Sequence, residues 1–243
     1  GVRRADVVEL RRTIDFHRGL ECAGTFTHFA TADVLDDWDF ALQLNRFREA
    51  VEALRGAGLD TGLVHCDNTP GTILHPECRF DMCRVGVGLY GLHPAETTLG
   101  QIDLEPVMSV RGRIVRVLYP SVGDGVGYGL TYRVPKQNIQ IATVPIGYAD
   151  GLARELSNNM DVLVGGCRCR QVGNICMDQC MFEVDLRSRS SVPTLDPHIG
   201  DEVLIAGPHP SVECSIDSMA NRAATIQHEV CIGFSHRMPR IYR

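Results

Sequence analysis

The chain has 243 residues, of which 44% are hydrophobic and 22% are charged, as in ordinary globular proteins. Its formal net charge of −6 argues against nucleic acid or an anionic membrane surface as the main partner. No apolar run approaches the roughly 18 residues that span a bilayer, and no signal peptide is recognised. We therefore expect a cytoplasmic protein.

The first hundred residues alternate between helical and strand-like patterns. This alternation is typical of parallel βα units. The predicted elements are a helix over 1–18, a short buried strand over 22–30, a helix over 36–56, a strand over 63–66, and a strand followed by a loop over 83–91.

The segment 36–56 carries the clearest amphipathic pattern in the chain. Its charged residues fall on one helical face, and Gly56 and Gly58 follow the last apolar position, as is common where a helix ends. We expect the other face to point inward with Trp38, Leu42, Leu44, Phe47, Val51 and Leu54.

After residue 100 the pattern changes to short alternating runs separated by turn residues, which predicts antiparallel strands. We place the domain boundary within 93–100, which gives a first domain over 1–98 and a β-rich domain over 99–243. Residues 188–200 are predicted to form a surface loop, and 219–225 a helix. The predicted strand segments are 107–120, 139–147, 161–173, 179–186 and 201–207.

Ten cysteines in a chain of this length, without a secretory signal, are expected to be free thiols. The cysteines at 167, 169, 176 and 180 form the single candidate metal site in the sequence. Their spacing differs from the paired C-x-x-C of a zinc ribbon. We predict that they pack inside a β-domain and hold no metal, and a zinc-binding β-module is kept as an alternative.

Tyr128 stands between glycines in the run GVGYG (125–129). Glycine allows the backbone to pass close to another group while the one phenol is presented. A hairpin turn with a surface tyrosine would have the same sequence, and most turn tyrosines have no role in chemistry. The neighbouring motifs therefore decide how this turn is interpreted.

Four further motifs follow one another in a fixed order around this turn. They are RVGVGLYG (84–91), PIGYADG (145–151), ICMD (175–178) and RMPRIY (237–242). Together with GVGYG, they make the chain resemble the alanine racemase family over its whole length. The resemblance implies a pyridoxal-phosphate enzyme built from a (β/α)8 TIM-type barrel and a mostly antiparallel β C-terminal domain.

In the first domain, the resemblance implies a set of cofactor-binding residues. Arg84 would donate a hydrogen bond to the pyridine nitrogen, and because arginine keeps its proton, the ring nitrogen would stay neutral. The backbone N–H groups of Gly86 and Val87 and the hydroxyl of Thr69 would bind the phosphate. His28, in THFATAD (27–33), would lie beside the ring. A strand-end histidine is otherwise more often structural.

In the second domain, the resemblance implies that Tyr128 is one of two catalytic bases, acting across a homodimer interface. Met177 would contact the substrate carboxylate through its backbone N–H. Tyr148 and Asp178 would lie at the entrance. His236 stands where the family pattern has a tyrosine that contacts the phosphate and borders the substrate pocket. We therefore expect His236 to bind the cofactor and to change the shape of the pocket, which makes serine a rival to alanine.

Residues 1–98 are too short for a closed eight-stranded barrel, which takes about 250 residues. We count about three barrel strands and expect this region to be the second half of the barrel, with Gly1 ending a motif of an absent N-terminal half. Lys136 is the only lysine in the chain. It falls in a polar turn, so we expect it to be a surface residue and the cofactor lysine to lie outside these residues.

These observations lead to three hypotheses. The first is racemisation of L- and D-alanine, supplying D-alanine for peptidoglycan in the bacterial cell wall, with a serine/alanine racemase as a variant of it. The second is a catalytically silent fragment that binds pyridoxal phosphate. The third is the zinc-binding β-module described above.

Overall fold

The computed structural model describes residues 1–186, 196–209 and 214–242. The chain divides into two compact units, Gly1–Glu105 and Pro106–Arg243, and each is described by itself. This division between Glu105 and Pro106 lies near the domain boundary that we predicted after residue 98. The exact position of the domain boundary stays a prediction. Among the described helices, none is long and apolar enough to cross a membrane.

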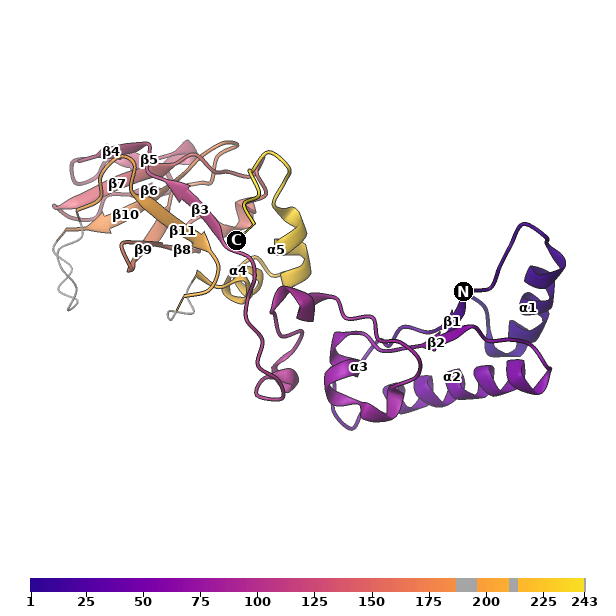
Figure 1. Ribbon diagram of the computed structural model, residues 1–243. Coiled ribbons are helices and arrows are strands. Elements are labelled where there is room, and N and C mark those ends of the chain that lie inside the picture. The colour runs from indigo at the N-terminus through magenta and orange to yellow at the C-terminus, as the bar shows by residue number, and fades with distance from the viewer. Residues whose placement is uncertain (187–195, 210–213, 243) are drawn as a thin grey trace. The chain divides into compact units, whose positions relative to one another are not determined.

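The N-terminal unit is built around the helix α2, which runs alongside two parallel strands, β1 and β2 (Figure 1). Its helices and strands are η1 (Arg4–Asp6), α1 (Val7–Phe16), β1 (Gly24–Phe26), α2 (Trp38–Gly56), β2 (Leu63–His65), α3 (Thr69–Leu74), η2 (Pro76–Cys78), η3 (Val87–Tyr90) and η4 (Glu96–Thr98).

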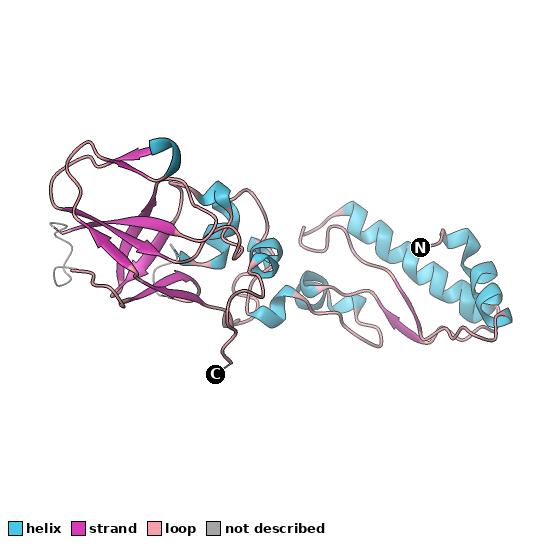
Figure 2. Ribbon diagram, turned by 90° about the horizontal axis from the view of Figure 1, so that it is seen from above, coloured by secondary structure: helices cyan, strands magenta, loops and turns pink. Residues whose placement is uncertain are grey.

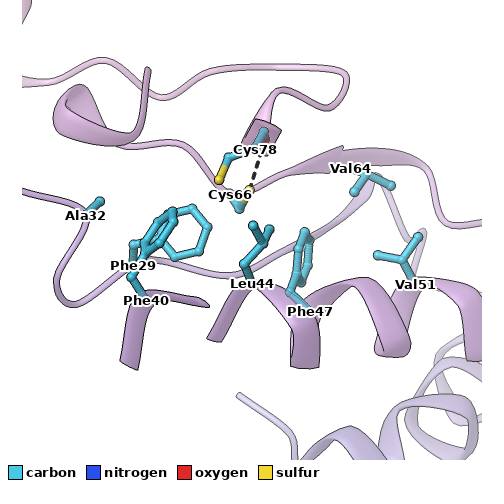
Figure 3. Packing of buried hydrophobic residues seen from close by; sticks show 9 residues of the cluster. All are labelled: Phe29, Ala32, Phe40, Leu44, Phe47, Val51, Val64, Cys66 and Cys78. Atoms are coloured by element: carbon cyan, nitrogen blue, oxygen red, sulfur yellow. Dashed lines mark hydrogen bonds between the residues drawn. The ribbon is translucent and has the colours of Figure 1, made fainter. Parts of the chain in front are cut away.

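The core of this unit lies between the inner face of α2 and the two strands. Figure 3 shows Phe40, Leu44, Phe47 and Val51 of the helix facing Val64 of β2. The apolar periodicity of 36–56 therefore predicted the buried face well. The prediction was wrong for Trp38, the first residue expected on this face, because Trp38 begins the helix and is 70% exposed.

Two further expectations for the N-terminal unit need correction. The strand predicted over 22–30 spans Gly24–Phe26 alone, and Phe26 is 64% exposed. No strand forms over the described residues 83–91. Gly86 has φ −107° and ψ −96°, outside the strand region, and the chain turns directly into η3. The unit therefore contains two parallel strands, and the half barrel stays a prediction.

The C-terminal unit is organised by one seven-stranded sheet with the strand order β3-β11-β8-β9-β10-β7-β4, whose pairs are all antiparallel. The antiparallel β prediction for this region is thus confirmed. The strands are β3 (Val110–Arg113), β4 (Arg116–Leu118), β5 (Gly125–Val126), β6 (Tyr132–Arg133), β7 (Ile139–Val144), β8 (Asp161–Val164), β9 (Cys167–Val172), β10 (Cys180–Asp185) and β11 (Glu202–Ala206).

The sheet curls, as Figure 2 shows. Its first and last strands, β3 and β4, are separated by two residues of the chain. Ile114 N–H donates to Asp201 O at 3.0 Å, and Val115 N–H donates to Thr143 O at 2.9 Å. The chain therefore passes from one edge of the sheet to the other. Phe182 and Ile205 lie fully buried within this unit.

Short helices complete the C-terminal unit. α4 (Ile216–Arg222) begins three residues before the start of the predicted helix over 219–225, whereas α5 (Gln227–Gly233) was not predicted. The remaining turns are η5 (Tyr128–Leu130) and η6 (Arg154–Leu156). Most of the loop predicted over 188–200 lies outside the described residues.

Candidate functional site

Arg84 lies in the loop that follows η2, and its guanidinium group reaches the ends of β1 and β2. One nitrogen, Nη2, donates to Thr27 O at 2.8 Å and lies 3.2 Å from His28 Nδ1. The other, Nη1, contacts His65 Nδ1. Burial, and secondarily the charge of Arg84, lowers the pKa of His65, so its imidazole is neutral and can accept this hydrogen bond. The guanidinium is thereby fixed in position.

The ring of Phe26 packs against both His65 and the guanidinium group of Arg84. Its ring stacks on His65 with centroids 5.3 Å apart, and the guanidinium carbon of Arg84 lies 5.2 Å from the Phe26 centroid. His65 was not among the predicted site residues. Its position at the start of HCDNTPG (65–71) was the available signal, because a histidine at the end of a parallel strand lies where ligands commonly bind.

Thr69 joins α3 to the loop that carries Arg84. Its Oγ1 accepts from Gly86 N–H at 3.0 Å and from Gly88 N–H at 3.4 Å. A Cβ atom on Gly88 would lie 2.8 Å from Thr69 Cγ2, so the two segments are in close contact. The N–H of Val87, predicted to bind phosphate, belongs to the first turn of η3, where N–H groups lack a partner within the helix.

The structure brings four of the five predicted cofactor residues of the N-terminal unit together in two pairs: Arg84 contacts His28, and Thr69 contacts Gly86. The fifth, Val87, follows Gly86 in the chain. A fixed cation and several backbone donors suit a ligand with an acceptor nitrogen and an anionic group. This donor set fits pyridoxal phosphate. The Gly86 N–H already serves Thr69, so a phosphate would share or displace that bond. The individual roles stay predictions.

In the C-terminal unit, Tyr128 is held in a tight turn and is 77% exposed. Gly127 and Gly129 have φ +70° and +74°, and a Cβ on Gly127 would lie 2.9 Å from Met181 Cε. Both positions therefore favour glycine. Asn174 Nδ2 donates to Tyr128 O at 2.8 Å, which ties the turn to the segment before ICMD. The backbone is thus fixed while the phenol remains accessible.

Tyr148 and Met177 lie on two loops that are bonded to each other. Tyr148 N–H donates to Cys176 O at 3.0 Å, and Ala149 N–H donates to Met177 O at 3.0 Å. A Cβ on Gly147 would lie 2.2 Å from Cys176 O, so the loops approach as closely as glycine permits. Both predicted residues are partly exposed, Tyr148 by 43% and Met177 by 54%.

Arg237, in the last motif, connects these loops to the residues around His236. Its Nη2 donates to Asp178 Oδ1 at 2.7 Å, and its Nε lies 3.6 Å from Asp150 Oδ1. The bond to Asp178, followed by the charge of Asp150, raises the pKa of Arg237. Ser235 N–H donates to Asp150 O at 2.8 Å, so the exposed His236 follows a fixed residue.

Four separate motifs thus meet in the C-terminal unit. A cavity of about 940 Å³ opens beside the tyrosine turn, and its walls include Arg116, Tyr119, Tyr128, Thr143, Cys176 and Gln179. Arg237, Asp150 and Asn174 were missed by the sequence analysis, although two of them lie inside the recognised motifs. The available signal was the place of each residue in the sequence: Asp150 and Arg237 are charged residues inside motifs, and Asn174 directly precedes ICMD.

Two predictions about other residues can also be compared with the structure. Lys136 is a surface residue, as predicted: its side chain is 60% exposed, and its Nζ lies 2.5 Å from Asp185 Oδ2. The four cysteines at 167–180 do not form a metal-binding group within the described part of the chain. Cys169 and Cys180 are buried thiols, each with a pKa raised by burial to about 12.

Two family models match the chain. "Alanine racemase, C-terminal domain" matches residues 107–242, and "Alanine racemase, N-terminal domain" matches residues 1–94. An alanine racemase of Symbiobacterium thermophilum is 37% identical over 242 residues, which are 100% of this chain and 62% of that protein. One from Desulfovibrio desulfuricans is 38% identical over 242 residues, with the same coverage.

Solved structures give the same result. The alanine racemase of Streptomyces coelicolor superposes with a TM-score of 0.88 at 32% identity, covering 98% of this chain and 61% of that one. The chain spans about three fifths of the length of these relatives. The match over residues 1–94 corrects one expectation, because the N-terminal domain is represented in the chain and is not absent as a whole.

Proposed function

This chain belongs to the alanine racemase family, and we propose that it acts as part of a pyridoxal-phosphate enzyme that interconverts L-alanine and D-alanine. The observation that supports this most strongly is the accessible phenol of Tyr128, fixed between two glycines beside a cavity. The product D-alanine would serve peptidoglycan synthesis.

The N-terminal unit would hold the cofactor. Arg84 is fixed by Thr27, His28 and His65, and from there it would donate a hydrogen bond to the ring nitrogen. Thr69, Gly86 and Val87 would bind the phosphate. The cofactor supplies an electron sink that makes the substrate Cα–H acidic. Because an arginine does not transfer its proton, this sink stays weak, which favours racemisation over side reactions.

The C-terminal unit would supply one of the two bases. Tyr128 would move a proton at one face of the substrate Cα, and a lysine outside this chain would act at the other. Lys136 is a poor candidate for the lysine because it is exposed and paired with Asp185.

The remaining residues would bind and admit the substrate. The Met177 N–H would contact the carboxylate, and Tyr148 and Asp178 would border the entrance. In the proposed homodimer these groups and Tyr128 would serve the partner's cofactor, so each active site would be shared. The bond from Arg237 to Asp178 would hold the entrance in shape.

The test is Tyr128→Phe, with Tyr119→Phe as the control because Tyr119 lines the same cavity. Loss of a well-placed base costs about 10²–10⁴ in rate. L- and D-alanine have equal free energies, so kcat/KM must fall equally in both directions. The asymmetry appears in the isotope effect: an α-deuterium on one enantiomer should slow the variant much more than on the other. Equal effects for both enantiomers would exclude Tyr128 as a one-sided base.

The position of the lysine is tested by borohydride reduction of the active protein followed by peptide mapping. We expect the pyridoxyl group on a lysine other than Lys136, and residues 1–243 alone should show neither bound-cofactor absorbance nor racemisation. A pyridoxyl group on Lys136 of an active chain would contradict our proposal that the cofactor lysine lies outside residues 1–243.

Serine is the second candidate substrate, because His236 replaces the tyrosine of the family pattern and is shorter. His236→Tyr should move the preference towards alanine by about 10–200-fold if this position shapes the pocket. An unchanged serine-to-alanine ratio of kcat/KM would remove His236 from the determinants of specificity.

A further inference from the structure

A cluster of potential metal ligands lies in the core of the N-terminal unit, outside the proposed cofactor contacts. Cys66, Asp67 and Cys78 are each 0% exposed. One ligand atom from each lies within 4.8 Å of the other two. Figure 3 shows Cys66 and Cys78 together at the edge of the core formed by α2, where the dashed line marks their hydrogen bond.

The distances within this cluster suit a tetrahedral ion. Cys66 Sγ lies 3.7 Å from Asp67 Oδ1, and Cys78 Sγ lies within 4.8 Å of the Cys66 Sγ and of one carboxylate oxygen of Asp67. A fourth candidate, Cys83, places its Sγ 3.5 Å from Asp67 Oδ2. Zinc binds sulfur at about 2.3 Å and carboxylate oxygen at about 2.1 Å, so ligand atoms around one tetrahedral ion are about 3.5–3.8 Å apart.

The charge of Asp67 gives a separate reason to expect a cation. Its carboxylate is fully buried, and its side-chain hydrogen-bond donors are the thiols of Cys66 and Cys83, which are weak donors. In the described part of the chain, no arginine, lysine or histidine forms an ion pair with it within 4.0 Å, although the charges of Arg79 and Arg84 act on it from beyond that distance. A buried carboxylate normally has an ionic partner or binds a metal.

We propose that Cys66, Asp67 and Cys78 bind a thiophilic divalent cation of the Zn²⁺ type, with Cys83 completing the coordination once its side chain turns towards the ion. Two or three thiolates exclude Mg²⁺ and Ca²⁺, which prefer oxygen. Four protein ligands make a closed, structural site. Cys83 is exposed, so the ion can enter from that side.

Such an ion would link the two segments that carry the proposed cofactor residues. Cys66 and Asp67 precede Thr69, and Cys83 precedes Arg84. These segments already meet where Arg84 N–H donates to Asp67 O at 2.9 Å. The bound ion would therefore stabilise the loop over 83–88 against the start of α3, whatever reaction the protein performs.

The experiment is a titration of the purified, metal-free protein with Zn²⁺ against a colorimetric chelator, together with Co²⁺ absorption spectra. We expect one Zn²⁺ per chain and a thiolate-to-cobalt charge-transfer band. Asp67→Asn, which keeps the side-chain shape, and Cys78→Ser should each weaken binding by more than about 100-fold, since even outer partners of a metal contribute about 10–100-fold.

The matched control is Cys180→Ser, because Cys180 is equally buried but lies on β10. It should bind Zn²⁺ as the unaltered protein does. Absence of stoichiometric Zn²⁺ uptake by the unaltered protein overturns the proposal without any variant having to fold. Loss of binding in Cys180→Ser with full binding in Asp67→Asn would also overturn it, and would place the ion among the cysteines of the β-sheet.

Discussion

The two units hold their functional loops in different ways. In the C-terminal unit, backbone hydrogen bonds join the loops directly, as between Tyr148 and Cys176. In the N-terminal unit, one backbone bond runs from Arg84 N–H to Asp67 O, and side chains make the other connections described above: Arg84 reaches Thr27, and Thr69 accepts from Gly86. The difference follows from the sheets, because seven paired strands fix many loop ends, whereas two strands fix few. A small sheet depends on individual side chains to position a site.

The sharpest test of this comparison removes one large core side chain from each unit. Phe47→Ala and Phe182→Ala should each cost about 3–5 kcal/mol, because both rings are buried. If the units fold separately, Phe47→Ala should weaken hydrogen-exchange protection in 1–105 alone, and Phe182→Ala in 106–243 alone. Uniform loss of protection in both units from either variant would show that they unfold together.

The second test compares two glycines at close approaches. Gly151 has φ +109°, and a Cβ there would lie 2.1 Å from Gly233 O, which is backbone. Gly151→Ala should therefore cost about 1–3 kcal/mol. Gly88→Ala meets a side-chain methyl of Thr69 at 2.8 Å, and that side chain can rotate. The two melting temperatures measure the difference, and a larger loss for Gly88→Ala would contradict our description of the two units.

The third test removes one helix N-cap from each unit. Asn68 accepts from Gly71 N–H, and Ser215 accepts from Ser218 N–H, each at 3.0 Å. Asn68→Ala and Ser215→Ala should each cost about 1 kcal/mol, measured by urea denaturation. A much larger loss for Asn68→Ala would indicate that the start of α3 contributes to the N-terminal unit beyond its cap.

The smallest expected effect concerns pH. Hydrogen bonds to Asp37, first from Thr31 and then from the N–H of Phe40, lower the pKa of this carboxyl from 3.8. The ionised Asp37 carboxylate therefore contributes fully to the stability of the N-terminal unit above pH 3.8. This contribution is lost as the pH falls through the lowered pKa of Asp37 in the folded protein. Asp37→Asn keeps a capping oxygen but cannot ionise, so stability should depend less on pH below 4. An unchanged acid profile would contradict this.

The sequence predicted those features that repeat along the chain. The face of α2 that carries Leu44, Phe47 and Val51 was evident from its period, and so were the strands of the curled sheet. Trp38 and the segment 83–91 were mispredicted, because apolar residues at a helix end or beside glycines resemble core positions. The fold around Gly86 depends on its contact with Thr69, which no local pattern records.

The same limit applies to the candidate sites. The motifs led us to predict that Tyr128, Tyr148 and Asp178 serve one site, because each motif is a short run that can be recognised in the sequence. They did not reveal that His65 supports Arg84, or that Cys66 and Cys78 meet. These contacts join segments that are separate in sequence, so they become visible when the chain is folded.

The curled sheet also determines the order in which the chain can fold during synthesis. β3 pairs with β11, so Val110 can form its strand contacts only after Ala206 has been synthesised. In the N-terminal unit, Gly24 pairs with Leu63, which is much nearer in the sequence. Contacts between distant residues form slowly. A ribosome must release the C-terminal unit as far as Ala206 before the sheet can close. Until then its strands have unpaired edges that chaperones recognise or that aggregate. The N-terminal unit can collapse much earlier.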